Sequence, residues 1–252
     1  MRRIALSLAL AAAAPWAAAA DDMGSSLSIG IEQTTGDYGQ AADTTITYVP
    51  ITAKLGNRPW QFGLTVPWIR VEGPGNVVRD VGRFRGAGGG TRTESGVGDV
   101  IAFATRALGT MPDGTAVDAT GKVKFGTASA GRGLGTGEND VHLQLDAYRS
   151  AGEFTPFGTV GYKILGDPTG IELRNVFYIS LGAARRLDTE RSAGLMWYGQ
   201  QKTTDGGDAQ SEVTAFYTRR FGGMWKAQFY GLIGMSDGSP DYGAGAMVIR
   251  AF

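Results

Sequence analysis

The chain has 252 residues, with 24 Lys and Arg against 24 Asp and Glu, and no cysteine. The balanced charge argues against a nucleic-acid-binding protein, and the lack of cysteine excludes a disulfide scaffold and a lipid anchor attached to a cysteine. The 40 glycines are about twice the usual share and, beside many threonine, valine and aromatic residues, indicate turns and closely packed strands.

Residues 1–20 have the features of a secretory signal that is removed after export. Arg2 and Arg3 precede an apolar run, and Ala18 and Ala20 occupy the small-residue positions before a cleavage site. A membrane-spanning helix is disfavoured because the run is short and is interrupted at Pro15. Residues 21–252 are predicted to form one domain. They contain no apolar run near the roughly 20 residues of a spanning helix, so membrane insertion would have to use strands.

From Ser25 onward the sequence divides into twelve extended segments, separated by clusters of glycine, proline, aspartate and asparagine. They are longer than the usual strand of about five or six residues and match the roughly 9 to 11 residues that cross a bilayer at a tilt. The predicted strands are Ser25–Gln33, Asp43–Leu55, Trp60–Glu72, Gly96–Leu108, Thr115–Phe125, Asp140–Arg149, Phe154–Ile164, Asn175–Leu187, Ser192–Gln201, Glu212–Arg220, Met224–Met235 and Asp241–Phe252.

The third segment shows the alternation most clearly. Between Trp60 and Trp68 every second residue is apolar, which predicts a strand with one lipid-facing or core-facing side. After Trp68 the phase changes, since Ile69 and Val71 are apolar while the residues between them are charged. Because Pro67 cannot donate a ladder hydrogen bond, the change indicates a bulge or the point where the strand leaves the membrane.

The connections between the predicted strands are alternately long and short. All long loops therefore lie at one end of the sheet, as in outer-membrane barrels with short periplasmic turns and longer outward loops. The opposite faces of several strands carry more polar residues than a dry sandwich core would accept. We therefore predict an all-β, transmembrane, up-and-down antiparallel β-barrel of about twelve strands.

The inward phase of this barrel supplies the candidate pore-lining residues. Lys122 and Lys124 are expected to face Asp140 and Asp146 across neighbouring strands, where opposite charges usually support the wall and sometimes select an ion. The candidates are Lys122, Lys124, Asp140, His142, Gln144, Asp146, Lys226 and Gln228.

The longest loop, Gly73–Ser95, is net basic. Folded inward it would narrow the pore and favour anions; folded outward it would contact the phosphates of lipopolysaccharide; a solvated loop without either role is the third alternative. Its candidate residues are Arg79, Arg83, Arg85 and Arg92.

Aromatic residues mark the expected membrane boundaries. In an outer-membrane barrel, tryptophans gather at the two lipid–water interfaces. The chain also ends on an aromatic residue, Phe252, through which we expect the barrel-assembly machinery to recognise it, although Arg250 stands where an apolar residue is usual. The candidate interface residues are Trp60, Trp68, Trp197 and Trp225.

The sequence contains one histidine, His142, and no cysteine, which makes a zinc site unfavourable. A barrel hydrolase would need a serine close to His142 in space, and none is near it in sequence. The glycine-rich strings lack the lysine and the following helix of a nucleotide-binding loop. We therefore predict no catalytic residue, no cofactor, no metal and no nucleic-acid partner.

Several strings resemble a known family, the outer-membrane proteins of the MetA pathway of phenol degradation, which are often described as transporters. The resemblance spans most of residues 21–252, and its departures are Lys124–Ser129, where the family tends to have a proline, and Arg250. It implies passage of small, often aromatic or hydrophobic compounds, and it assigns no catalytic or ligand residue. The strings are TGDYG from Thr35, VPWIRVEGPG from Val66, GVGDV from Gly96, GLGTGENDV from Gly133 and GYKILGDPTG from Gly161.

These observations predict a non-enzymatic outer-membrane channel of a Gram-negative bacterium for small hydrophobic or aromatic solutes. A barrel enzyme of the lipase or protease type, and a passive surface barrel whose loops bind partners, are the alternatives. Outer-membrane lipid and lipopolysaccharide are the expected surroundings.

Overall fold

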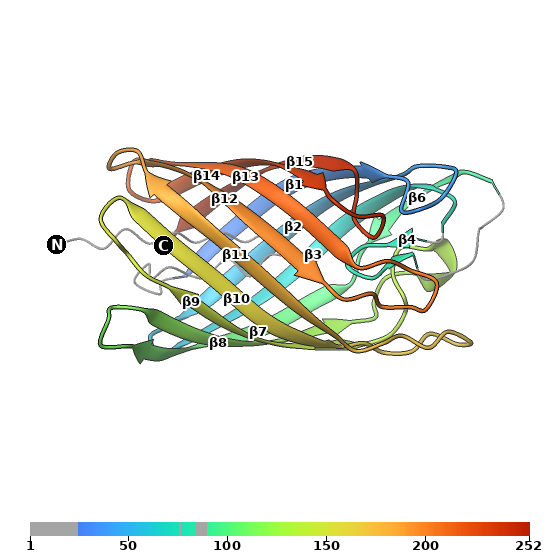
Figure 1. The fold of residues 1–252 in the computed structure, drawn as a ribbon, viewed down its shortest axis with the longest axis horizontal. Coiled ribbons are helices and arrows are strands. Elements are labelled where there is room, and N and C mark those ends of the chain that lie inside the picture. The colour runs from blue at the N-terminus through green and yellow to red at the C-terminus, as the bar shows by residue number, and fades with distance from the viewer. Residues whose placement is uncertain (1–24, 76, 84–89) are drawn as a thin grey trace.

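The computed structural model describes residues 25–75, 77–83 and 90–252. The predicted signal segment lies outside these residues. The chain forms a barrel of long tilted strands (Figure 1), with a single short 3₁₀ turn, Ala130–Arg132, in its described part. The strands are β1 (Ser26–Gly36), β2 (Thr44–Asn57), β3 (Trp60–Gly73), β4 (Val77–Val78), β5 (Gly82–Arg83), β6 (Arg92–Val97), β7 (Val100–Thr110), β8 (Ala116–Phe125), β9 (Asp140–Tyr148), β10 (Phe154–Ile164), β11 (Val176–Arg186), β12 (Arg191–Gln200), β13 (Gln210–Phe221), β14 (Trp225–Gly234) and β15 (Tyr242–Ala251).

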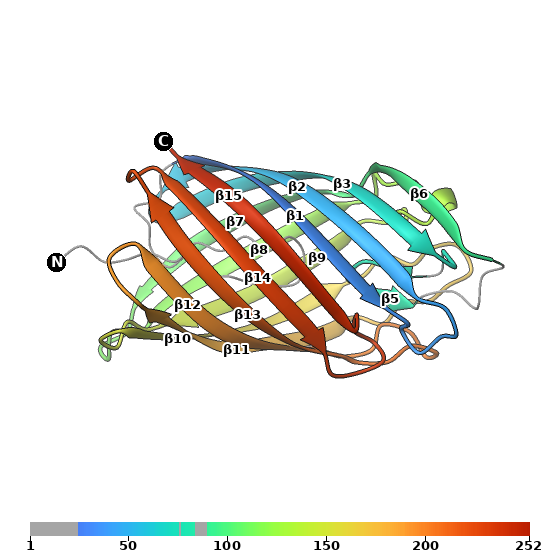
Figure 2. The ribbon, with the colours of Figure 1, turned by 90° about the horizontal axis from the view of Figure 1, so that it is seen from above.

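The sheet closes on itself. Each barrel strand pairs antiparallel with the next barrel strand along the chain, and β1 also pairs with β15, so the first and last strands join; β4 and β5 form a separate two-stranded sheet. Because β6 and β7 both pair with β3, they are two segments of one barrel strand. The prediction of a twelve-stranded antiparallel barrel is confirmed. Figure 2 shows β1, β14 and β15 side by side where the sheet closes.

The two faces of the sheet have opposite polarity. On β3, Phe62 and Leu64 are about half exposed to the outside, whereas Gln61 and Thr65 are buried inside. The same alternation continues on β1, where Leu27, Ile29 and Ile31 face outward. Apolar side chains outside and polar ones inside are the arrangement of a barrel in lipid, because only lipid favours an apolar outer band.

The short turns, the start of β1 and the C-terminus lie at one end of the barrel, and the long loops lie at the other (Figures 1 and 2). Ser26 pairs with Ala251, which brings the start of β1 and the end of β15 together at the short-turn end. The turn between β13 and β14 uses Gly222 and Gly223 with φ of 55° and 77°, a region that glycine enters without steric cost. The predicted alternation of loop lengths is therefore present.

The predicted irregularity at Pro67 lies on the neighbouring strand. The pairing of β2 with β3 runs from Asn57 to Thr45 without a shift, so β3 has no bulge. Thr65 pairs with Ile101 and Trp68 pairs with Val97, so two residues of β3 face three on the strand that contains β6 and β7. The extra residue makes a bulge opposite Pro67, where β3 lacks one donor.

The apolar residues that follow Trp68 have an inward role. Ile69 and Val71 point into the barrel, where Val77 of β4 packs against them and against Tyr48. On the other side of the same hairpin, Val78 and Val81 pack against Leu165 and Leu173 of the loop after β10. The phase change therefore marks the level at which a folded-in hairpin, residues 77–83, replaces water in the outer mouth. We call it the mouth hairpin.

Within the described residues, no helix is long and apolar enough to cross a membrane.

Candidate solute pathway inside the barrel

A charged wall lines the interior along β8, β9 and β10. The Lys124 ammonium lies 3.0 Å from a carboxylate oxygen of Asp140 and 3.0 Å from one of Asp99, which lies in the bulge. Lys122 lies opposite His142 rather than an aspartate, and Asp146 lies opposite Asp118. The expected pairing of two lysines with two aspartates therefore holds for Lys124 and Asp140 and is wrong for the other pair.

His142 has lysines on both sides. It lies opposite Lys122 on β8 and opposite Lys163 on β10, so no serine stands beside it in either register. Ser180 lies opposite Thr159, which is four residues away from Lys163 along β10. This surrounding does not supply the serine that a hydrolase mechanism needs.

Below these lysines, toward the short-turn end, the wall becomes a hydrogen-bonded network. The Tyr178 hydroxyl donates to Gln144 over 2.9 Å, and the Gln144 amide donates to the Asp146 carboxylate over 2.7 Å. Thr159 also donates to Asp146. These side chains are buried, and their polar groups satisfy one another, which removes most of the cost of burial.

A second feature of the interior is a set of aromatic rings on β7, β10, β11, β13 and β14, and their geometry was not evident from the sequence. Inward aromatic rings lie flat over glycines that stand directly opposite them on the next strand; an added Cβ on these glycines would lie 2.1 to 2.4 Å from the ring. The sequence signal is present but cannot be read without the register of the strands. The ring and glycine pairs are Phe103 with Gly63, Phe157 with Gly182, Tyr178 with Gly161, Phe216 with Gly194 and Tyr230 with Gly245.

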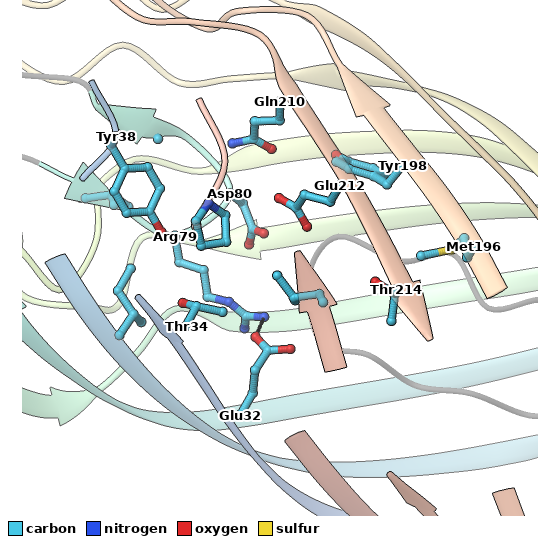
Figure 3. Close-up of a pocket in the computed structure, with 15 residues that line it drawn as sticks. Glu32, Thr34, Tyr38, Arg79, Asp80, Met196, Tyr198, Gln210, Glu212 and Thr214 are labelled. Atoms are coloured by element: carbon cyan, nitrogen blue, oxygen red, sulfur yellow. Dashed lines mark hydrogen bonds and ion pairs between the residues drawn. The ribbon is translucent and has the colours of Figure 1, made fainter. Parts of the chain in front are cut away.

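The mouth hairpin carries Arg79 into the interior. Its guanidinium forms an ion pair with Glu32 of β1, and its carbon Cζ lies 3.8 Å from the centroid of the Tyr48 ring. The Tyr230 hydroxyl donates to the second carboxylate oxygen of Glu32 over 2.7 Å. Figure 3 shows the Arg79 side chain extending to Glu32 across the cavity. Glu32, Tyr48 and Tyr230 form what we call the arginine socket.

The charge of Arg79 is strongly retained. Burial by itself lowers the pKa of the guanidinium, but the nearby carboxylates of Glu32 and Asp80 outweigh it, and the pKa is raised above its ordinary value. The backbone of the hairpin is also held by the loop after β12, because Thr203 donates to the Val81 carbonyl over 2.6 Å. Ion pairing with hydrogen bonding is what a buried charge requires to be stable.

Arg79 and Glu32 lie between two cavities and line both of them. The outer cavity contains about 670 Å³ of space between side chains, part of it open to solvent. Its lining includes Tyr38, Tyr198 and Glu212 together with Glu32 and Arg79 (Figure 3). The inner cavity is smaller and lies toward the short-turn end; Glu32 and Arg79 line it too, with Gly30, Tyr48, Pro50, Tyr230 and Met247. The ion pair is therefore placed at the level where the two cavities meet.

The other basic residues of the long loop have different positions. Arg92 lies at the start of β6, and its guanidinium packs against Gly75 and Gly133. Arg83 ends β5, and Arg85 lies outside the described residues. The loop is thus folded inward through its described hairpin, and an outward contact with lipopolysaccharide stays untested.

The remaining candidates fall on the faces expected for them. Lys226 and Gln228 point inward from β14 and are buried. Within the described residues, neither amide atom of Gln228 nor the hydroxyl of Thr218 opposite it has a hydrogen-bond partner. The four tryptophans Trp60, Trp68, Trp197 and Trp225 are outward and 38 to 42% exposed. The described part of the chain contains no group of three or more His, Cys, Asp or Glu residues placed to hold a metal ion.

Solved structures place this architecture among outer-membrane barrels. An outer membrane channel from Pseudomonas putida F1 superposes with a TM-score of 0.74 at 13% identity, over 92% of this chain and 97% of that one. The NanC porin superposes with a TM-score of 0.57 at 9% identity over 90% and 99%. The CymD monoaromatic hydrocarbon channel gives 0.50 at 11% identity over 92% and 89%.

No protein-family model matches the sequence, and no curated protein matches it either. At these identities the structural likeness shows the fold, a closed twelve-stranded barrel of the outer-membrane type. The resemblance to the MetA-pathway family stays a prediction.

Proposed function

We propose that the protein is an outer-membrane channel for small solutes and that the mouth hairpin closes it in the described state. The carrying observation is the position of the Arg79–Glu32 ion pair, which lies between the outer cavity and the inner one and lines both. A barrel of twelve strands lies between eight-stranded barrels filled by side chains and sixteen-stranded open porins. Because the lumen of such a barrel is narrow, one charged side chain that reaches into it from a loop can decide whether it conducts.

The structural neighbours support this role, because they are described as channels and porins. The apolar outer band and the alternation of loop lengths support placement in the outer membrane of a Gram-negative bacterium after signal cleavage near Ala20. The exposed C-terminal Phe252 stays our proposed contact for the assembly machinery.

The gate is tested by conductance in planar bilayers. We expect wild-type protein to conduct weakly and Arg79→Ala to conduct at least several-fold more, because the substitution removes the side chain that extends from the mouth hairpin to Glu32 between the two cavities. The matched control is Arg174→Ala, which removes an exposed arginine paired with Asp205 at the same end and is expected to leave conductance unchanged. If neither wild type nor Arg79→Ala conducts, the channel proposal fails.

We further propose that the solutes are small and partly aromatic or hydrophobic. Support comes from the resemblance and from the rings of Phe157, Tyr178, Phe216 and Tyr230, whose faces line one part of the interior. Such rings offer stacking surfaces, and the amide and hydroxyl groups nearby offer hydrogen bonds, as in other selective sites.

Matched sugars separate this proposal from an unselective pore. Phenyl β-glucoside and methyl β-glucoside share the sugar and differ in the ring, and we expect vesicles with Arg79→Ala protein to take up the phenyl compound faster. Adding Phe216→Leu should reduce that difference. Faster passage of the smaller methyl compound in both variants would show sieving by size and would remove the aromatic preference.

A further inference from the structure

Four arginines on the outer surface of the barrel lie over aromatic rings near the short-turn end. In three of them the ring and the arginine stand directly opposite each other on neighbouring strands, and in the fourth they are two residues apart on β13. The distances from Cζ to the ring centroid are 5.4 Å for Arg106 and Trp60, 5.7 Å for Arg185 and Phe154, 5.6 Å for Arg219 and Phe221, and 5.4 Å for Arg250 and Trp225. We call these eight residues the arginine belt.

The belt lies at one level and is spread around the barrel. Its rings stand at the first or last residue of β3, β10, β13 and β14, next to the short turns. Those strand ends occupy the end of the barrel opposite to the long loops (Figures 1 and 2). A repeat on three separate parts of the circumference indicates a feature of the membrane boundary rather than a local contact.

Most of the belt charge has no acidic partner. Arg185 lies 3.2 Å from Glu153, but among the described residues Arg106, Arg219 and Arg250 form no ion pair with a carboxylate. All four arginines are exposed. Each ring fixes its guanidinium in place, since a cation over an aromatic face gains roughly 0.5 to 1 kcal/mol at an exposed site, and leaves its N–H donors available.

An arginine held over an aromatic ring at the lipid boundary fits the phosphate of a lipid headgroup. The guanidinium binds phosphate through two parallel hydrogen bonds, and an arginine is less strongly hydrated than a lysine. Apolar side chains lie beside the belt to contact the acyl chain, among them Leu27 directly opposite Arg250. The excess positive charge favours a headgroup with net negative charge over a zwitterionic one.

We propose that the arginine belt binds the phosphate of anionic phospholipids in the leaflet at the short-turn end. This inference rests on the proposed placement in the outer membrane, where that leaflet faces the periplasm. The ligand that we propose for the belt is an anionic phospholipid of the phosphatidylglycerol type.

The test uses the tryptophans of the folded barrel as reporters. Wild-type protein is reconstituted in phosphatidylcholine vesicles that contain, at equal mole fraction, brominated phosphatidylglycerol or brominated phosphatidylcholine, and bromine quenching of tryptophan fluorescence is measured. We expect about twofold stronger quenching by the anionic lipid, and the excess should fall in high salt because the attraction is electrostatic.

Two triple variants decide the assignment. R106Q/R219Q/R250Q keeps the rings and removes the three belt charges that form no ion pair with a carboxylate among the described residues, while Arg185 stays paired with Glu153; its quenching by the two lipids should become equal. R70Q/R132Q/R174Q removes three exposed arginines at the long-loop end that pair with carboxylates, and it should keep the wild-type excess.

Equal quenching in wild type, or loss of the excess in both triple variants, would overturn the proposal. Conductance of Arg79→Ala protein tests the channel separately. A barrel that conducts without a lipid preference therefore contradicts lipid binding by the arginine belt and leaves the proposed function in place. A barrel that shows the lipid preference and never conducts supports the arginine belt and contradicts the proposed channel function.

Discussion

The long loops and the outward strand ends near the short turns use arginine in different ways. At the long-loop end, Arg132 and Arg174 pair with Glu94 and Asp205, and Arg79 pairs with Glu32 inside the mouth. At the short-turn end, Arg106 and Arg250 lie over Trp60 and Trp225. One set is neutralised within the protein and holds loops in place, whereas the other keeps its charge directed at the surroundings.

This difference in the partners of arginine follows from the other side chains in each region. The outer loops, residues 37–43, 74–91, 126–139, 165–175, 201–209 and 235–241, hold ten acidic against six basic residues, so an arginine there finds a carboxylate. The short turns also supply carboxylates, to Arg149, Arg185 and Arg191. The outward strand ends beside these turns carry aromatic rings, and Arg106, Arg219 and Arg250 lie over such rings. The side chain within reach of a guanidinium, a carboxylate or a ring, therefore decides whether the arginine organises the fold or meets the membrane.

The largest loss of stability is expected from a substitution inside the mouth of the barrel. Glu32→Gln removes one partner of a buried ion pair and leaves the Arg79 charge in the socket, which should lower the free energy of unfolding by about 3 to 5 kcal/mol. Urea unfolding of the barrel in vesicles, followed by tryptophan fluorescence, measures the change. The double variant Glu32→Gln with Arg79→Met removes both charges and should recover most of the loss; a single variant of near wild-type stability would show that water screens the pair.

A smaller but still large loss of stability is expected for an arginine on the lipid-facing surface midway between the two ends. Leu64 faces outward midway between Trp60 and Trp68, so Leu64→Arg places a charge at mid-bilayer and should cost about 2 to 4 kcal/mol. Leu55→Arg makes the same change near the short turns and should cost only about 0 to 1 kcal/mol. Both are measured by urea unfolding in vesicles, and equal costs would mean that the apolar band is placed wrongly.

The smallest effect is expected for exposed pairs at the long-loop end. Arg174→Ala breaks an ion pair whose side chains are 55% and 80% exposed, and it should change the free energy of unfolding by about 0.2 to 1 kcal/mol. The same unfolding experiment in high salt should remove the difference from wild type, because salt screens exposed charges. A cost above 2 kcal/mol would show that the loops stabilise the barrel far more than exposed pairs can explain.

The sequence by itself determined the faces of the strands and the ends of the barrel. The period of two assigns each side chain to one face, and alternating loop lengths assign each turn to one end, so both are local properties of the chain. The outward position of Phe62 and Leu64, and the inward position of Asp140 and Gln228, could therefore be predicted without a structure.

Only the tertiary structure decided which residues meet. The partner of Lys122 and the bulge opposite Pro67 depend on strand register, and a shift of two residues keeps every face while changing every pair. The pairing of aromatic rings with glycines has the same origin. The direction of the long loop was undecidable for another reason: Arg79 folds inward because Glu32, Tyr48 and Tyr230, distant from it in sequence, form its socket only after the barrel has closed.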